Sequence, residues 1–291
     1  MSDMNGMTTT KRPEQQFKLC LESPALVGAK DRDGWVGLFH ADGFVEDPVE
    51  AGRYQGTAAI TNFWDVFIGP QPSVGFELER DFFGTRTLIR QATVVSMTEA
   101  DAHEPLRVPA LIVYTLRDDR VGSLRAVWEP IGVIRWFVGR GAAGMKALAR
   151  HGGRMMRKAG LANAMRFGGT LVRGMAHARA EALVREVVAA DPARGPTRLD
   201  GAKITIAGPD VEAEFERDAA AAIERLQALA GGALAQWGVD RLVVCGDHVA
   251  ASLVEPAGPG ALAVLVRVGS GGAIEALTAI WSPSPQVLTR A

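Results

Sequence analysis

Two apolar blocks of the sequence end in the same way, and this repeat constrains the fold more than any other feature. Leu124-Arg-Ala-Val-Trp-Glu-Pro130 matches Leu277-Thr-Ala-Ile-Trp-Ser-Pro283 at an offset of 153, and each follows an apolar run, at 108–116 and 261–268. A repeat of about 110–120 residues favours duplication of a whole domain over a solenoid of short units. The 291 residues are enough for two domains.

Hydrophobic periodicity predicts that the first copy is α+β. Three helices are expected, over 14–30 with a kink or new start at Ser23-Pro24, from an N-cap at Asp33, and from an N-cap at Thr57. Alternating residues then predict strands near 43–47, 75–82, 85–98, 106–117 and 120–129, with a turn at Asp118-Asp119. Helices followed by antiparallel strands favour a curved sheet wrapped around the helices, with a cone-shaped cavity.

The second copy is expected to have the same cone-shaped fold in a degenerate form. Its helix is predicted over 212–229, and an ungapped match of Ile60 to Ile223 places Asp210 against Asp47. The expected organisation is therefore α+β, with two cone-shaped domains that each pack N-terminal helices on a curved antiparallel sheet. They would span 12–130 and 176–285, joined by a basic helical connector over 131–175.

Charge divides the chain into three blocks. Residues 1–130 carry a net charge of −6, residues 131–180 carry ten cations and no acid, and residues 181–291 carry −5. Five methionines and other apolar residues alternate with the cations of the basic block, and its many glycines favour several short helices. This block can dock on the two acidic domains, on an anionic membrane surface or on another partner. Nucleic acid is not expected, because the domains are acidic and the block lacks an aromatic platform.

Several other classes of protein lack support in the sequence. Cys20 and Cys245 lie far apart in apolar runs and are expected to be buried, inert thiols. The histidines and cysteines form no cluster with metal-ligand spacing, so neither metal nor cofactor is expected. The N-terminal residues have no apolar core, and no apolar stretch reaches 18 residues. We expect a cytoplasmic protein, with peripheral membrane association as an alternative.

The segment Phe44-Val-Glu-Asp-Pro-Val49 places an acid at the end of a half-buried strand. Apolar surroundings disfavour the charged form of a carboxyl group and raise its pKa, which suits a general acid or base near neutral pH. Asp47 is therefore the candidate catalytic residue. The alternative is an ordinary Asp-Pro turn on the surface.

Residues 33–64, DGWVGLFHADGFVEDPVEAGRYQGTAAITNFW, resemble the ketosteroid isomerase-like, or SnoaL-like, branch of the nuclear transport factor 2-like superfamily. Polyketide cyclases and limonene-type epoxide hydrolases belong to the same superfamily. The resemblance is clear over about residues 15–130 and weak over 175–283. It implies a pocket for an apolar molecule of steroid, polyketide or acyl type, with Asp47 as a base for proton transfer.

The residues that assist that base in the isomerases are not present at the matching positions of this sequence. The position of the oxyanion tyrosine falls at Ser23 and that of the oxyanion acid at Ile112, although Tyr114 on the same strand face is a substitute donor. Loss of one such donor typically lowers the rate about 10²–10³-fold. Loss of both should leave little steroid isomerisation, and isomerase, lyase and hydrolase activities all stay open. Cavity walls are predicted at Trp64, Phe67 and Trp128, with plain core packing as the alternative for each.

Two further possibilities follow from these residues. An epoxide hydrolase constellation would use Glu77, Glu79, Arg90 and Arg125, unless the two glutamates lie on the outer face of the sheet. A non-catalytic carrier of a ligand or lipid would instead dock on membranes through 131–175. A homodimer formed through the sheets is a third hypothesis, by analogy with the fold.

Overall fold

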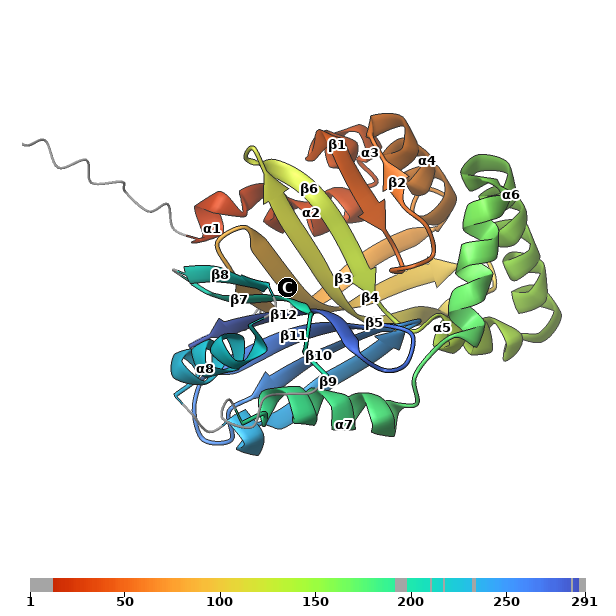
Figure 1. The fold of residues 1–291 in the computed structure, drawn as a ribbon. Coiled ribbons are helices and arrows are strands. Elements are labelled where there is room, and N and C mark those ends of the chain that lie inside the picture. Colours follow the sequence, from red (N-terminus) through yellow and green to blue (C-terminus); the bar gives the residue numbers. More distant parts are fainter. Residues whose placement is uncertain are drawn as a thin grey trace, which may run out of the picture.

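The computed structural model describes residues 13–191, 198–209, 211–216, 218–231, 234–283 and 285–287. It contains two α+β domains whose sheets face each other, with a helical segment along one side (Figure 1). Both the α+β class and the two-domain architecture expected from the sequence are confirmed.

The first domain starts with helices and continues with strands. Its helices are α1 (Pro13–Gln16), α2 (Lys18–Gly28), α3 (Arg32–Gly37) and α4 (Thr57–Phe67). Its strands are β1 (Phe39–Glu46), β2 (Tyr54–Gln55), β3 (Ser73–Phe83), β4 (Thr87–Thr98), β5 (Asp101–Arg117) and β6 (Arg120–Val127). Asp118 and Asp119 both have positive φ, as a tight hairpin turn between twisted strands requires.

The first sheet is mixed, where the sequence predicted an antiparallel one. Its order is β13-β3-β4-β5-β6-β1-β2, and β1 runs parallel to β6 with Val45 opposite Leu124. The two-residue strand β13 (Gln286–Val287) comes from the end of the chain and pairs with β3. A parallel pair needs a long connection, and here helix α4 and the four strands β2 to β5 separate β1 from β6 along the chain.

Helix starts differ from the prediction by one or two residues. Asp31 rather than Asp33 caps α3, and its Oδ1 accepts a hydrogen bond from the Gly34 amide at 2.9 Å. Gly56 is the N-cap of α4, and Thr57 is its first helical residue. Neither difference moves a helix, because capping residues act within one turn.

Pro24 lies inside α2 without ending it. A proline has no amide hydrogen for the carbonyl four residues earlier, which here is Cys20. Arg90 Nη1 donates to that carbonyl at 3.4 Å. A buried side chain thus compensates the hydrogen bond that proline cannot make.

The second domain repeats the order of elements. Its helices are α7 (His177–Val188), α8 (Ala219–Leu229) and a short 3₁₀ turn, η1 (Leu234–Gln236). Its strands are β7 (Lys203–Gly208), β8 (Val211–Glu216), β9 (Gly238–Cys245), β10 (His248–Val254), β11 (Ala261–Val268) and β12 (Ile274–Ser282). The sheet order is β8-β7-β12-β11-β10-β9, and β7 runs parallel to β12 as β1 does to β6. The shared topology is consistent with tandem duplication.

The helix expected over 212–229 begins later than predicted. Residues 211–216 form β8, because Val-Glu-Ala-Glu-Phe-Glu alternates with the period of a strand, and the helix covers only 219–229. Asp210, matched to Asp47 from the sequence, lies outside the described residues. The parallel registers place Ile206, which is fully buried, at the position equivalent to Asp47.

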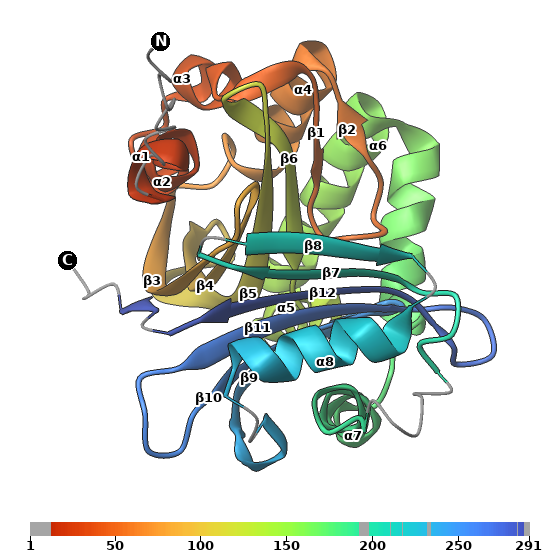
Figure 2. The same cartoon turned by 60° about the vertical axis from the view of Figure 1, so that its left-hand side comes forward.

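The two sheets pack against each other through apolar side chains. Leu111 and Val113 of β5 point toward this interface and meet Ala263 and Leu265 of β11 in one buried cluster. At the edge, Arg241 forms two 2.9 Å contacts with Glu79 across the interface. In Figure 2 the second sheet lies between the first domain and helices α7 and α8.

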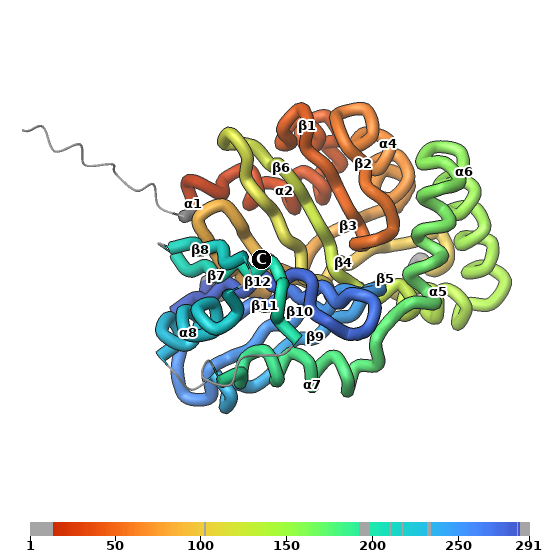
Figure 3. The backbone as a smooth tube through the Cα atoms, in the orientation of Figure 1, coloured from red at the N-terminus to blue at the C-terminus, as the bar shows by residue number. Residues whose placement is uncertain are grey.

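The segment between the sheets is helical. It comprises α5 (Pro130–Val138) and α6 (Gly141–Val172), and α6 is interrupted at Gly160, where φ is 83°. Figure 3 shows the chain passing from α6 beside the first domain to α7 on the far side of the second sheet. Within the described part of the chain, no helix is long and apolar enough to cross a membrane.

Candidate functional site

A cavity of about 220 Å³ lies between the helices and the concave face of the first sheet. Strand alternation brings Ala110, Ile112 and Tyr114 of β5 to its wall, while Leu111 and Val113 face the other sheet. The same face of the sheet continues at the end of β6. Among the described residues of the second domain, Ile206 stands at the position of Asp47, and large apolar side chains from α7, α8 and the sheet form the core.

Helices α5 and α6 close the open end of this cavity. Val133 and Phe137 of α5, together with Leu148, His151 and Phe167 of α6, contribute to its lining. Sequence reasoning treated this segment as a connector and missed its role. The signal that could have revealed this role was the spacing of apolar residues, three and four apart, within the basic block.

Ion pairs hold α5 and α6 on the first domain. Arg140 at the turn between the two helices lies 2.7 Å from Glu104, Arg150 lies 2.6 Å from Glu99, and Lys158 lies 2.6 Å from Asp65. These three cations of the basic segment therefore dock on the acidic first domain.

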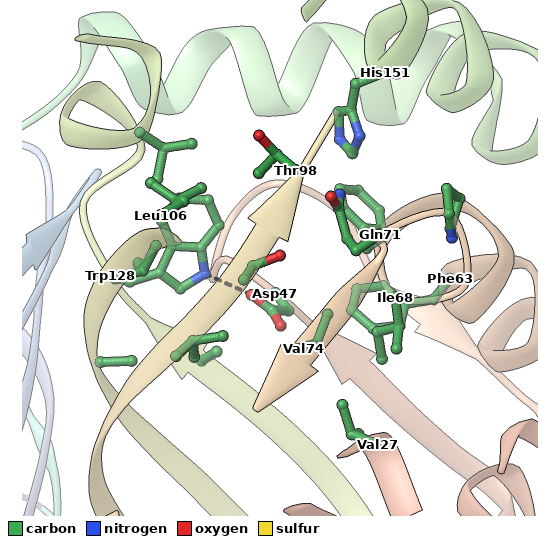
Figure 4. Close-up of a pocket in the computed structure, with 18 of the residues that line it drawn as sticks. Val27, Asp47, Phe63, Ile68, Gln71, Val74, Thr98, Leu106, Trp128 and His151 are labelled. Atoms are coloured by element: carbon green, nitrogen blue, oxygen red, sulfur yellow. Dashed lines mark hydrogen bonds between the residues drawn. The ribbon is translucent and has the colours of Figure 1, made fainter. Parts of the chain in front are cut away.

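Asp47 is the carboxylate at the cavity wall. It follows β1 directly and shares a face with Val45, so the alternation of the strand directs it inward. Trp128 Nε1 donates a hydrogen bond to Asp47 Oδ1 at 2.5 Å (Figure 4). Burial raises the pKa of Asp47 to about 6, against the smaller opposing effect of that hydrogen bond.

A second polar site at the cavity is a hydrogen-bonded cluster centred on Ser23. Its Oγ accepts a hydrogen bond from Trp35 Nε1 at 3.0 Å and one from Tyr114 Oη at 3.3 Å. Burial raises the pKa of Tyr114 to about 12, so its phenol stays protonated and can donate. Ile112 also lines the cavity but supplies no donor.

The predicted aromatic walls separate into two groups. Phe67 lines the cavity and contacts the His151 ring edge-on at a centroid distance of 5.1 Å. Trp64 belongs to the apolar core, where its ring lies 5.5 Å from that of Trp35. Helical spacing alone cannot separate these two environments, because both residues lie on the buried face of α4.

The carboxylates and arginines considered for epoxide hydrolysis do not converge. Arg90 is fully buried and binds Asp81 with two hydrogen bonds of 2.7 and 2.6 Å. Glu79 binds Arg241 of the second domain, and Arg125 binds Glu46 at 2.9 Å. None of these residues lines the cavity around Asp47.

Metal binding finds no support in the part of the chain that the structure describes, where no three His, Cys, Asp or Glu side chains cluster. Cys20 and Cys245 are buried and free, as expected. Burial raises the pKa of each thiol to about 12, which makes both poor nucleophiles at neutral pH.

Comparison with protein families matches residues 22–123 to the SnoaL-like domain. This part of the chain is a SnoaL-like domain. The match includes Ser23, Asp47, Phe67 and Tyr114, but it ends before Trp128 and before α5 and α6. A comparison with curated proteins found no match.

Three solved structures illustrate the likeness of this SnoaL-like domain to known folds. A Mycobacterium tuberculosis protein in complex with estradiol-17β-hemisuccinate is 20% identical over 41% of this chain and 96% of its own, with a TM-score of 0.37. The Δ5-3-ketosteroid isomerase from Mycobacterium sp. is 22% identical over 40% of this chain and 94% of its own, with a TM-score of 0.36. The epoxide hydrolase/cyclase-like enzyme SalBIII is 20% identical over 40% and 91%, also with a TM-score of 0.36.

Proposed function

We propose that the SnoaL-like domain binds an apolar small molecule of steroid, polyketide or acyl type, and that Asp47 transfers a proton on it. One observation carries this proposal. The carboxyl group of Asp47, held by Trp128 at the wall of an apolar cavity, has a pKa raised to about 6. Such a group is mostly ionised at neutral pH and is still basic enough to accept a proton from carbon.

The proposed step is an intramolecular proton transfer. Ionised Asp47 removes a proton from the carbon beside a ligand carbonyl, the C–H electrons form a C=C bond, and the carbonyl electrons move to oxygen. Tyr114 exchanges its hydrogen bond to Ser23 Oγ for one that it donates to that oxygen. Asp47 then returns the proton to a different carbon, so the product is an isomer with the same atoms. Trp128 occupies Oδ1, which leaves Oδ2 for the proton.

Conversion of a β,γ-unsaturated ketosteroid to its conjugated isomer tests this function, followed by the ultraviolet absorbance of the enone. We expect turnover by the natural protein and a loss of about 10²–10⁴-fold in Asp47→Asn, the usual effect of removing a general base. Substitution of the exposed Asp200 by Asn is the control. Wild-type turnover by Asp47→Asn would contradict the role of Asp47. If the natural protein bound the steroid without turnover, the function that remained would be that of a non-catalytic carrier.

A second candidate function is docking on an anionic membrane surface, and it rests on a different observation. All seven large apolar side chains found exposed among the described residues lie on α5 and α6. They are Ile131, Val138, Met145, Met156, Leu161, Met165 and Val172. Lys146, Arg157 and Arg173 lie among them in a segment without acids. Apolar side chains interspersed with cations are typical of helices that lie in the lipid headgroup region.

Co-sedimentation with vesicles tests the membrane candidate. We expect binding to vesicles of phosphatidylserine and phosphatidylcholine that weakens with salt, and little binding to phosphatidylcholine alone. The double variant Leu161→Glu/Met165→Glu should lose it, since both side chains are more than half exposed, at 64% and 68%. Equal sedimentation of the natural protein and this variant would argue against docking through α6.

A further inference from the structure

Arg154 is a cation at the wall of the cavity with no partner of its own. It lies one helical turn after His151 on α6, and both residues line the cavity. Its Nε atom is buried and makes no hydrogen bond within the described part of the chain. No carboxylate of the described residues lies within ion-pair distance of it.

The other cations that face the first domain from this segment differ from Arg154. Arg140, Arg150 and Lys158 each contact a carboxylate at 2.6–2.7 Å. Glu99 also lines the cavity, but it pairs with Arg150. Arg154 is therefore not needed to hold α6 in place. A buried guanidinium nitrogen without a partner is costly, and a ligand that supplied an acceptor would remove that cost.

Apart from Arg154 itself and from Glu99, which pairs with Arg150, the polar groups that line this end of the cavity are neutral. Gln71 and Thr98 line it, and no hydrogen bond of the Gln71 side chain occurs among the described residues. Burial, together with the charge of Arg154, lowers the pKa of His151 to about 4, so its ring is neutral at physiological pH. One guanidinium without a second cation matches one negative charge, such as a carboxylate, better than the double charge of a phosphate.

Figure 4 shows which residues lie at the two ends of the cavity. His151 and Thr98 lie at one end of the cavity, Val27 lies at the opposite end, and Asp47 lies between them. We propose that Arg154 binds the carboxylate of an amphipathic ligand at the α6 end of the cavity, while the apolar body of the ligand extends along the wall past Asp47. This inference rests on the proposed function, because it assigns the polar end of the same ligand.

Two ligands with the same apolar chain test the assignment: decanoate and decanol, with decyl phosphate as a third arm. Binding is measured by displacement of the neutral dye N-phenyl-1-naphthylamine and by calorimetry. We expect decanoate to bind about tenfold to a hundredfold more tightly than decanol or decyl phosphate, the usual range for a charge-assisted hydrogen bond. Because this comparison uses the natural protein, it does not depend on the folding of any variant.

Variants then locate the effect. Arg154→Gln should lose the preference for decanoate and keep its affinity for decanol, and Arg154→Lys should restore part of the preference. Arg166→Gln removes an exposed cation from the same helix, and it should bind both ligands like the natural protein.

Three results would overturn the assignment: equal binding of decanoate and decanol by the natural protein, unchanged decanoate binding by Arg154→Gln, or stronger binding of decyl phosphate. Binding of neither decanol nor decanoate would refute the proposed ligand cavity itself, and this assignment with it.

Discussion

Replacing Asp47 by Asn should make the protein more stable, and the gain should depend on pH. The pKa of Asp47 is raised to about 6 in the folded protein, against about 4 for an aspartate in an unfolded chain. The folded state therefore holds the proton more tightly than the unfolded state does. Stability is greatest below the unfolded pKa, falls as the pH rises toward the folded pKa, and is constant above it.

The size of the effect follows from the two pKa values. Ionisation of Asp47 costs the folded state about 3 kcal/mol at about pH 8, but less than about 1 kcal/mol at about pH 4. Asparagine avoids this cost, and its side-chain oxygen can still accept the hydrogen bond from Trp128. Asp47→Asn should therefore exceed the natural protein in stability by up to about 3 kcal/mol at the higher pH, with little difference at the lower one.

Urea unfolding at both pH values, followed by circular dichroism, measures this difference. Asp200→Asn, which changes an exposed acid, should show no comparable gain at either pH. A gain that is the same at both pH values, or a loss that is largest at high pH, would refute the conclusion that Asp47 is destabilised by burial. The same variant should be inactive, so the acid is expected to lower stability while providing the proposed chemistry.

Three further predictions concern neighbouring residues. Trp128→Phe removes the hydrogen bond that lowers the pKa of Asp47, so carbon-13 NMR titration of that carboxyl should give a pKa above about 6; an unchanged pKa would contradict the assignment. Asp81→Asn leaves Arg90 buried without its carboxylate and should lower the free energy of unfolding in urea by about 3–5 kcal/mol. A decrease below about 1 kcal/mol would show that Arg90 finds another partner. Ala126→Phe places a ring in the cavity and should weaken decanol binding at least about tenfold, with an unchanged circular dichroism spectrum; full binding would place the ligand elsewhere.

Much of the first domain could be predicted because its signals are local. Strand alternation identifies which residues of β5 and β6 share a face, and apolar spacing identifies the buried face of α4. Asp47 and Trp128 could therefore be named before their contact was known. Local signals cannot place Phe67 at the cavity and Trp64 in the core, because the difference depends on which elements pack over each side chain.

The second domain shows where a repeat can mislead. Matching helices without gaps set Asp210 against Asp47. The stretch from Ile206 to Ile223 is longer than that from Asp47 to Ile60, however, and strand register puts Ile206 opposite the matching residue. Register depends on hydrogen bonds between segments distant in the chain, which no local pattern specifies.

The sequence by itself determined the α+β class, the duplicated order of elements, and an acid at the end of an apolar strand. Only the tertiary structure decided that α5 and α6 close the cavity and that Arg154, among ten cations of the basic segment, is the one at its wall without a carboxylate. The reason is physical. Periodicity indicates which residues of one element share a face. The charge state and the partners of a side chain depend on other elements, because these exclude solvent from it and supply the carboxylates near it.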